Sequence, residues 1–385
     1  MRIAIVTEGF RPYIGGVEAR YTKFAEGLAR NHEVDVYTVL QNGIPVSSAA
    51  VTSEEKDGRL SIYRLHLGDK YFLKDGTRSA RDVVKFAKEV TKRLINEEYD
   101  AIILSEWPLL HILYLHSNLK LGDRRKLVID WHEVWDSYYL RYGLKGFLGY
   151  VLERQIARLK EPTHIAVSQF TRNRLRKISK NLREIPVITN GIELHEFHEN
   201  TEREREYGKI LFFGRFVPHK GIDKLVGAFA ILKKYDRDVK LYIIGDGPLR
   251  EHVKRLSKMV DGVHVLMSLE RRELIKHIKT SWVVVIPSER EGQGISYLEA
   301  MAAGTPVVTI KSPLNAFSNM VRNGVEAIVA EPTHNSIAES IHRLMKDHCL
   351  WSSLSQNGRK FAQQFTWSSS LKRLEKVLAT VCTNG

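Results

Sequence analysis

Cysteine is scarce in this sequence. Only Cys349 and Cys382 occur among 385 residues, so neither a disulfide framework nor a cysteine-based metal site organises the fold, and a reducing cytoplasm is the expected compartment. Long hydrophobic runs are missing as well. The first residues form a short strand pattern without the apolar stretch of a signal peptide, and the run 101–116 is interrupted by Glu106 and His111. We therefore expect no segment that spans a bilayer.

Two common phosphate-binding signatures are also absent. The chain contains no G-x-x-x-x-G-K-[ST], and the turn after the first strand pattern does not match G-x-G-x-x-G. Gly15 and Gly16 nevertheless lie in that turn, before the first predicted helix. Because glycine lacks a Cβ, this pair allows a ligand to approach the backbone closely or the backbone to adopt a positive φ.

Basic residues outnumber acidic ones, and the formal net charge is +14. This excess predicts attraction to something anionic, which could be nucleic acid, an acidic membrane surface or phosphorylated substrates. A nucleic-acid-binding protein would use the charge for phosphate contacts. The basic residues are scattered through predicted helices, however, and no helix-turn-helix, zinc-finger or RNP-like pattern accompanies them. Nucleic acid is therefore not the expected partner.

Apolar runs of strand length alternate with helix-like segments in two series along the chain. This alternation predicts βαβ units, and hence an α/β fold with parallel sheets. The first series occupies 1–187 and the second 188–366, so we predict two Rossmann-like domains, each long enough for its own core. Residues 367–385 have the apolar spacing of one more amphipathic helix. Such sheets bind ligands at the carboxyl ends of their strands.

The stretch 289–308, EREGQGISYLEAMAAGTPVV, predicts a turn and a helix after an apolar strand. Gly292 and Gly294 lie in the turn, where backbone N–H groups and the positive end of the helix dipole suit an anionic diphosphate. Glu299, inside the helix, could reach ribose hydroxyls. Glu291, before the turn, could meet the hydroxyls of the group attached to the phosphates. The alternative is that both acids merely cap and solvate a surface helix.

Two cations follow a strand in the same half of the chain. Arg215 comes directly after the strand pattern, and Lys220 stands five residues later, before a helix. Cations at the carboxyl end of a strand suit a diphosphate held without metal, although such a pair in a polar loop can also be only solvated. In the first half, His132 is expected at the carboxyl end of another strand, with a structural role as the alternative.

Seven short segments carry a family resemblance. They are GGV at 15–17, DWHE around His132, AVSQFTRNRL from 166, VITNGIELHEF from 187, GRFVPHKG from 214, IIGDGPLRE from 243 and PSEREGQGISYLEAMAAGTPVV from 287. In their nature and order these segments resemble those of the retaining, nucleotide-sugar-dependent glycosyltransferases of family 4, also called group 1, which have the GT-B fold. The resemblance covers nearly the whole chain and is strongest in the second half.

The resemblance implies two Rossmann-like domains whose parallel sheets face each other across a deep cleft. Residues 1–187 would bind the acceptor and 188–366 the donor, while the helix in 367–385 would pack back toward the first domain. The donor would be a UDP- or GDP-sugar, with no cofactor or metal ion required. The implied contacts are Arg215 and Lys220 to the diphosphate, Glu299 to the ribose, Glu291 with Gly292, Gln293, Gly294 and Ile295 to the sugar and phosphates, His132 to the sugar, and Gly15 with Gly16 to the phosphates.

The resemblance also implies the chemistry. The leaving diphosphate, stabilised by Arg215 and Lys220, would accept the proton of an acceptor hydroxyl that attacks from the same face, which gives retention. Together with Glu291 and His132, these cations form the expected catalytic set.

Two departures from the family pattern bear on the donor sugar. Gln293 stands where the family often has Phe. The segment 310–324, IKSPLNAFSNMVRNG, replaces the common Gly-Gly-x-x-Glu pattern, with Asn319 near the expected Glu.

Other classes of protein could use the same residues. The two glutamates could be the acid and nucleophile of a retaining glycoside hydrolase, with carboxyls ~5 Å apart, but that class has no use for the two cations. Asp236 and Asp238 form an Asp-x-Asp pattern, but they precede a strand, where a solvated loop is expected instead of a metal site. A nucleotide-sugar-binding protein without transferase activity is a further alternative.

The acceptor is left open between a lipid-linked or glycan acceptor at the membrane surface and a small soluble sugar or sugar phosphate. The basic charge fits an anionic membrane. The relevant segments are the predicted helix 147–160, with Leu148, Leu152, Ile156 and Leu159 on one face, and the basic-aromatic segments 69–74 and 138–146. Such a face suits peripheral membrane contact, while an apolar stripe at helical spacing is otherwise part of the core. We expect a cytoplasmic enzyme of glycan biosynthesis, peripheral on the inner face of the membrane.

Overall fold

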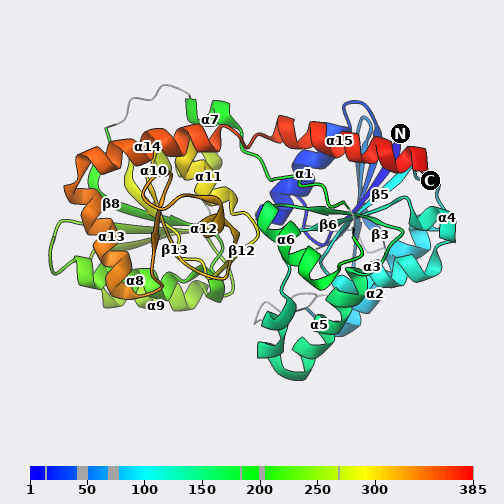
Figure 1. Ribbon diagram of the computed structural model, residues 1–385, viewed down its shortest axis with the longest axis horizontal. Coiled ribbons are helices and arrows are strands. Elements are labelled where there is room, and N and C mark those ends of the chain that lie inside the picture. Colours follow the sequence, from blue (N-terminus) through cyan, green and yellow to red (C-terminus); the bar gives the residue numbers. More distant parts are fainter. Residues whose placement is uncertain are drawn as a thin grey trace. The chain divides into compact units, whose positions relative to one another are not determined.

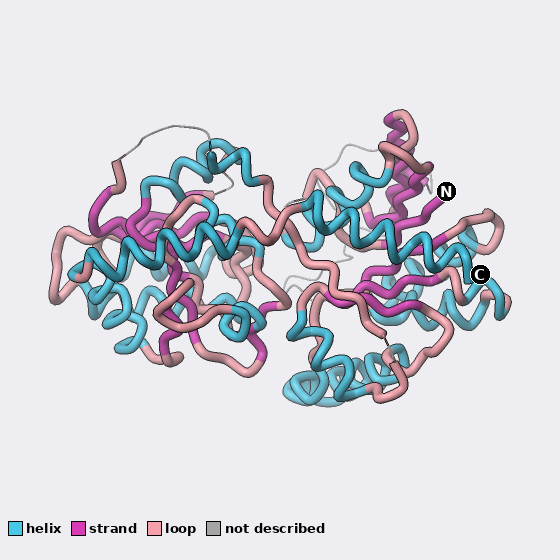
Figure 2. Tube along the Cα trace, turned by 45° about the horizontal axis from the view of Figure 1, so that its top comes forward, coloured by secondary structure: helices cyan, strands magenta, loops and turns pink. Residues whose placement is uncertain are grey.

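The computed structural model describes residues 1–13, 15–40, 51–67, 78–182, 184–198, 204–267 and 269–384. The chain divides into two compact units, the first made of Met1–Thr189 with Ser368–Gly385 and the second of Asn190–Trp367 (Figure 1). These divisions lie within two residues of the boundaries expected from the sequence. In each unit a central sheet lies among helices (Figure 2). The predicted α/β class, with one Rossmann-like sheet in each unit, is confirmed.

The sheet of the first unit has seven strands in the order β3-β4-β2-β1-β5-β6-β7. Neighbours run parallel except for the edge pair of β3 and β4. Helices cover both faces, so inner-strand residues such as Ile3 and Ala4 are fully buried. The strand order reverses between β1 and β5, which is the switch point where Rossmann sheets bind ligands. The strands are β1 (Arg2–Val6), β2 (Glu33–Val39), β3 (Val51–Asp57), β4 (Leu60–Leu65), β5 (Ala101–Ser105), β6 (Leu127–Trp131) and β7 (Thr163–Ala166).

The last helix of the chain packs in the first unit. A Cβ built on Gly27 would lie 2.3 Å from Leu371 Cδ1, so glycine is what lets α15 approach α1 this closely. Among the described residues, no helix combines the length and the apolar character needed to cross a membrane. The helices here are α1 (Gly16–Leu28), α2 (Ala80–Leu94), α3 (Leu109–Asn118), α4 (Leu121–Arg124), the 3₁₀ helix η1 (Asp136–Tyr142), α5 (Gly143–Ile156), α6 (Gln169–Ile178) and α15 (Trp367–Asn384).

The second unit has a six-stranded parallel sheet in the order β10-β9-β8-β11-β13-β15. Its switch point lies between β8 and β11, so the loops that follow these two strands are the expected ligand loops. A separate two-stranded ladder joins β12 to β14. The strands are β8 (Glu206–Phe213), β9 (Lys240–Ile244), β10 (Val263–Leu266), β11 (Ser281–Val285), β12 (Arg290–Glu291), β13 (Val307–Ile310), β14 (Leu314–Asn315) and β15 (Ile328–Ala330).

The helices of the second unit follow the same alternation. They are α7 (Leu194–His198), the 3₁₀ helix η2 (Pro218–Lys220), α8 (Ile222–Leu232), α9 (Arg250–Met259), α10 (Arg271–Thr280), α11 (Ile295–Ala302), α12 (Ala316–Met320), α13 (His334–Lys346) and α14 (His348–Ala362). Asp236 and Asp238 lie before β9, and the backbone N–H of Asp238 donates to Asp236 Oδ1 at 3.0 Å. This pair therefore forms a local turn at the opposite end of the sheet from the ligand loops.

Candidate functional site

The two loops at the switch point of the second unit touch each other. The loop after β8 continues into η2, and a Cβ on Gly221 would lie 2.3 Å from the carbonyl oxygen of Pro287, in the loop after β11. The backbone N–H of Glu289 donates to the carbonyl oxygen of His219 at 2.8 Å. Gly221 also has a positive φ of 69°, which favours glycine. These contacts bring the two predicted clusters of site residues together.

Lys220 and Glu291 form an ion pair across these loops. Both side chains are largely buried, at 16% and 10% exposure, so neither is a freely solvated surface group. The Ser288 hydroxyl donates to the same Glu291 oxygen, Oε1, at 3.1 Å. Among the described residues, the other oxygen, Oε2, has no hydrogen-bond partner, and it can therefore accept a hydrogen bond from a ligand hydroxyl.

Arg215 lies on the same loop as Lys220 and is exposed, without an ion-pair partner among the described residues. Its charge nevertheless affects the pKa of a neighbouring histidine. The pKa of His219 is lowered to about 2 by burial and then by Arg290, Lys220 and Arg215. His219 is therefore neutral, and the loops present a positive field suited to an anionic group. Sequence reasoning missed His219 and Arg290, although both adjoin predicted site residues.

A glycine-containing loop fixes the position of Arg215. Gly245 follows β9 with φ 151°, and a Cβ there would lie 1.9 Å from the carbonyl oxygen of Gly214. The backbone N–H of Phe216 donates to the carbonyl oxygen of Asp246 at 2.7 Å. The segment IIGDGPLRE therefore positions the loop that carries the cation, and in this structure that is its contribution to the site.

The turn before α11 combines glycine geometry with a buried amide. Gly294 has φ 83°, and a Cβ there would lie 2.4 Å from the Tyr297 ring. The side chain of Gln293 is 2% exposed; its Oε1 accepts the N–H of Asn190 at 2.6 Å and its Nε2 donates to the Asn190 carbonyl at 3.1 Å. Because its side chain is occupied by Asn190, Gln293 can contact a donor substrate only through its backbone, as Gly292 and Ile295 would. All three lie at the start of a helix, where backbone N–H groups lack helical partners.

Glu299 is buried in α11 and held by a residue that sequence reasoning missed. Arg271, the first residue of α10, donates from Nη1 to Glu299 Oε1 at 2.5 Å and from Nε to Glu196 Oε2 at 3.0 Å. Burial raises the pKa of Glu299, and Arg271 opposes that effect. Within the described part of the chain, Glu299 Oε2 has no partner, so one oxygen stays available for a ligand hydroxyl.

The segment that departs from the family pattern forms a buried support. Asn315 donates from Nδ2 to the carbonyl oxygen of Ser288 at 2.8 Å and to Thr309 Oγ1 at 3.2 Å. Asn319 donates to the carbonyl oxygen of Asn315 at 2.8 Å, so it stabilises its own short helix. Through Asn315 the segment positions Ser288, which in turn contacts Glu291.

His132 in the first unit ends a buried chain of polar groups. Arg20 donates to both oxygens of Asp130, at 2.8 and 2.9 Å. The Tyr21 hydroxyl donates its only hydrogen to Asp130 at 3.1 Å, so at the 2.9 Å contact between Tyr21 and His132 Nε2 the histidine is the donor. His132 therefore carries its proton on Nε2 and leaves Nδ1 as an acceptor.

Glu106, at the end of β5, fixes the backbone of His132. Its carboxylate accepts the backbone N–H of His132 at 2.8 Å and that of Glu133 at 2.9 Å. Burial, followed by the charge of Glu133, raises the pKa of Glu106 well above its usual range. The sequence offered a signal for Glu106, an acid directly after a buried strand, but only as an interruption of an apolar run.

The Gly15 and Gly16 turn is packed against its own helix. A Cβ on Gly15 would lie 2.1 Å from Glu18 Oε2, and α1 begins at Gly16. The space beside Gly15 is taken by the Glu18 carboxylate in this structure. A phosphate at this turn would require Glu18 to move away.

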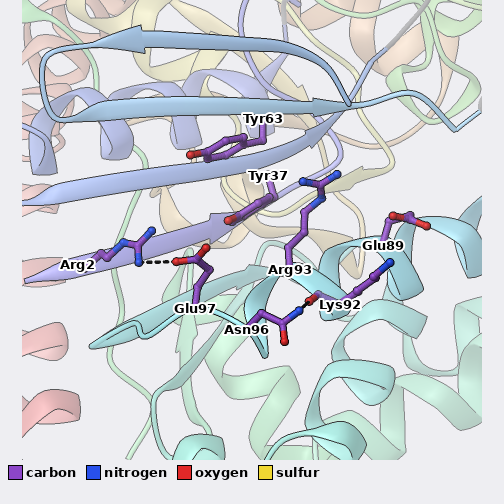
Figure 3. Close-up of a pocket in the computed structure, with 8 residues that line it drawn as sticks. All are labelled: Arg2, Tyr37, Tyr63, Glu89, Lys92, Arg93, Asn96 and Glu97. Atoms are coloured by element: carbon purple, nitrogen blue, oxygen red, sulfur yellow. Dashed lines mark hydrogen bonds and ion pairs between the residues drawn. The ribbon is translucent and has the colours of Figure 1, made fainter. Parts of the chain in front are cut away.

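A cavity of about 380 Å³ in the first unit holds none of the predicted site residues (Figure 3). Tyr37 and Tyr63 stack in it with ring centroids 5.1 Å apart, and Arg2 pairs with Glu97 at 2.8 Å. Its lining residues are Arg2, Tyr37, Tyr63, Glu89, Lys92, Arg93, Asn96 and Glu97. The candidate site therefore rests on the strand-end loops and not on this cavity.

Neutral buried histidines make stability depend on pH. The pKa of His132 and of His164 is lowered to about 4, chiefly by burial, and His164 accepts from Trp131 Nε1 at 3.0 Å. A folded-state pKa below the unfolded value of about 6.5 means that the unfolded chain binds more protons between these values. The folded state therefore has its full stability above pH ~6.5 and loses stability as the pH falls toward ~4. At pH 5 the loss in the free energy of unfolding is roughly 2 kcal/mol for each histidine.

Denaturation curves at pH 7 and pH 5 test this expectation. Because the raised pKa of Glu106 acts in the opposite sense in every variant, the informative quantity is a difference: on going from pH 7 to pH 5, His164→Gln should lack about one histidine's share of the destabilisation that the unmodified chain shows. His195→Gln is the matched control, because the His195 side chain is 75% exposed. An unchanged pH dependence in His164→Gln would contradict the assignment of a neutral His164.

Two family models match adjoining parts of the chain and together cover most of it. The model described as Glycosyltransferase Family 4 matches residues 14–196, and the model described as Glycosyl transferases group 1 matches 195–361. An uncharacterized glycosyltransferase of Methanocaldococcus jannaschii is 28% identical, with 98% of this chain and 97% of that protein covered. The GDP-mannose-dependent alpha-(1-6)-phosphatidylinositol monomannoside mannosyltransferase of Mycolicibacterium smegmatis is 25% identical, with 97% of each chain covered.

A solved structure shares the whole architecture. Sucrose-phosphate synthase from Thermosynechococcus elongatus superposes with a TM-score of 0.83 over 100% of both chains, at 20% identity. At this identity the likeness shows the fold alone. The GT-B fold expected from the sequence is confirmed.

Proposed function

Because the chain belongs to the group 1 and family 4 glycosyltransferases, and is thus an enzyme of sugar transfer, we propose that it uses a nucleotide diphosphate sugar and transfers the sugar to an acceptor hydroxyl with retention. The observation that carries this proposal is the ion pair of Lys220 with Glu291 across the two loops of the switch point, with Arg215 on the first of these loops and Glu299 in the helix that follows the second. Arg215 and Lys220 supply the positive charge there, and Glu291 and Glu299 each keep one oxygen without a partner among the described residues.

The chemistry assigned to the cations is stabilisation of the leaving group. When the bond between sugar and diphosphate breaks, negative charge grows on the diphosphate, and Arg215 with Lys220 stabilises that charge. In the proposed reaction, the acceptor oxygen bonds to the anomeric carbon on the face that the diphosphate leaves, and the hydroxyl proton passes to a diphosphate oxygen. This displacement needs neither a protein nucleophile nor a metal ion.

The carboxylates and the histidine are assigned to recognition. Glu291 Oε2 accepts a hydrogen bond from a sugar hydroxyl, and Glu299 Oε2 accepts from a ribose hydroxyl. His132 Nδ1 also accepts, so in this proposal its partner is a hydroxyl of the sugar and not a phosphate oxygen. The backbone N–H groups at the start of α11 bind the phosphates.

A GDP-mannose-dependent relative supports a nucleotide sugar as donor, and we keep UDP- and GDP-sugars as the candidate donors. The same relative is named as a mannosyltransferase of phosphatidylinositol monomannoside, which favours a lipid-linked or glycan acceptor over a small soluble sugar. In this proposal the enzyme works in the cytoplasm at the membrane surface.

A donor screen followed by product analysis tests the proposal. Ligands that bind only the folded protein raise its melting temperature according to RT ln(1 + [L]/Kd), so one UDP- or GDP-sugar should stand out. With that donor, NMR of the product should show the donor's anomeric configuration, and a chelator should leave the rate unchanged. An inverted anomer or a rate abolished by chelation would refute the mechanism, and hydrolysis without any acceptor would favour a glycoside hydrolase.

A further inference from the structure

A cluster of exposed apolar side chains lies on η1 and the first turns of α5. We call it the apolar tip. The helix α5 lies at the periphery of the first unit (Figure 1), and its apolar tip side chains are between 49% and 81% exposed. Contiguous exposed apolar side chains mark interaction surfaces in soluble proteins. The apolar tip consists of Leu140, Tyr142, Leu144, Phe147 and Leu148.

The apolar tip is held by close packing between η1 and α5. A Cβ on Gly146 would lie 1.8 Å from the carbonyl oxygen of Tyr139, and one on Gly149 would lie 2.6 Å from the Tyr139 ring. Glu153 accepts the backbone N–H groups of Trp135 and Asp136 at 2.8 and 2.7 Å. These contacts occupy the inner side of both helices, so the outer apolar side chains have no core into which they can fold.

A cluster of aromatic rings around Trp135 includes Tyr142 of the apolar tip. The Trp135 ring centroid is 4.9 Å from that of Tyr139, 5.6 Å from that of Tyr138 and 6.2 Å from that of Tyr142. Tyrosine and tryptophan are favoured where an apolar environment meets a polar one, since each ring carries a polar atom.

The stripe expected from the sequence proves to be mostly core. Ile156 is fully buried, and Leu152 and Leu159 pack against the hydrophobic core of the first unit. Only Leu148 of that stripe is exposed. The segment 69–74, expected beside it, lies outside the described residues, so the exposed surface is the apolar tip and not the predicted helix face.

The positive charge around the apolar tip favours an anionic partner. Arg141 and Lys145 are exposed within it, and no acidic residue occurs between Ser137 and Leu152. A second copy of this chain would bring an equal net charge of +14, which disfavours self-association. We propose that the apolar tip inserts into an anionic lipid surface, with its apolar side chains at the level of the acyl chains and Arg141 and Lys145 at the headgroups.

Vesicle co-sedimentation tests the apolar part of this proposal. The full chain should bind vesicles of phosphatidylglycerol and phosphatidylcholine. The double variant Leu144→Ser with Phe147→Ser should bind them with an affinity at least about tenfold lower. The matched control is Leu121→Ser with Met259→Ser, which removes two apolar side chains that are 61% and 77% exposed elsewhere. Equal loss in the control, or no binding by the unmodified chain, would overturn the proposal.

The cations have a separate test. Arg141→Gln with Lys145→Gln should weaken binding to the anionic vesicles by about fivefold per charge, whereas Lys372→Gln with Lys376→Gln, on exposed positions of α15, should change it little. Unchanged binding in the first pair, or equal binding to pure phosphatidylcholine, would overturn the headgroup assignment. A dimer that disappears in the Leu144→Ser, Phe147→Ser variant, without vesicle binding, would assign the surface to a second copy. This inference rests on the membrane location given in the proposed function, but none of these measurements uses sugar transfer, so its failure would leave the proposed transfer reaction standing.

Discussion

Lys220→Ala and Arg215→Ala are each expected to lower turnover by about 100-fold or more. In the proposed mechanism both cations face a charge that grows as the diphosphate leaves, so their interaction with it is stronger in the transition state than with the bound donor. The expected loss is therefore in kcat, measured with saturating donor. Their ground-state surroundings differ, because Lys220 is paired with Glu291 while Arg215 is exposed.

This difference decides which controls are informative. Lys220→Ala also leaves the buried Glu291 without its cation, so Lys220→Arg, which keeps the charge, should recover part of the lost turnover. Lys224, in the first turn of α8, is the matched neighbour. It pairs with Glu289 of the loop after β11 at 2.9 Å, and Lys224→Ala should change turnover little. Arg237 lies at an exposed position before β9, and Arg237→Ala is the matched control for Arg215→Ala. Normal turnover in folded Lys220→Ala and Arg215→Ala would show that these cations do not stabilise the leaving group.

The location of the two cations was predictable from the sequence because each signal was local. A basic residue directly after a buried strand lies at a sheet's carboxyl edge whatever the tertiary detail, and Arg215 needed no more than that. The partner of Lys220 needed more, since Glu291 is 71 residues away. Whether two loops touch is set by glycine positions such as Gly221, whose role becomes visible only when Pro287 is placed beside it.

Long-range partners explain what the sequence left out. Arg271 holds Glu299 from 28 residues away and reaches Glu196 across 75, and Gln293 holds Asn190 across 103. No local pattern marks these pairs, because a single arginine or glutamine in a polar segment has many possible partners. The same limit applies to the α5 stripe. Its period of 3.6 predicted the helix, but which side is buried was set by η1 packing against it.

The two carboxylates are expected to separate into two different functions. Glu299 is assigned to ribose, a part of the donor remote from the bond that breaks. Glu299→Gln should therefore weaken binding of the free nucleoside diphosphate itself, by about tenfold to 100-fold for a hydrogen bond to a charged group. The effect should appear chiefly in KM, because contacts to ribose are the same in the ground state and the transition state.

Glu291→Gln should behave in the opposite way. Glu291 is assigned to the sugar, which free nucleoside diphosphate lacks, so its affinity for that ligand should stay nearly unchanged while kcat falls. The Gln variant keeps an oxygen that can accept from Ser288, as Glu291 Oε1 does at 3.1 Å, so the loop should keep its shape. Lys220, freed from its carboxylate, would be more available to phosphate, which gives Glu291→Gln equal or tighter diphosphate binding.

Titration calorimetry of the two variants with the free nucleoside diphosphate measures this contrast directly. Glu289→Gln is the matched control, since Glu289 is also an acid of the same loop but its side chain is 45% exposed and paired with Lys224. It should leave both affinity and turnover close to those of the unmodified chain. If Glu291→Gln and Glu299→Gln instead bound the diphosphate equally well, and each removed a different limb of a bell-shaped pH profile, the carboxylates would be an acid and base pair. In that case they would act on the glycosidic bond itself, and the Oε2 atoms of Glu291 and Glu299 would be reacting groups and not acceptors for sugar and ribose hydroxyls.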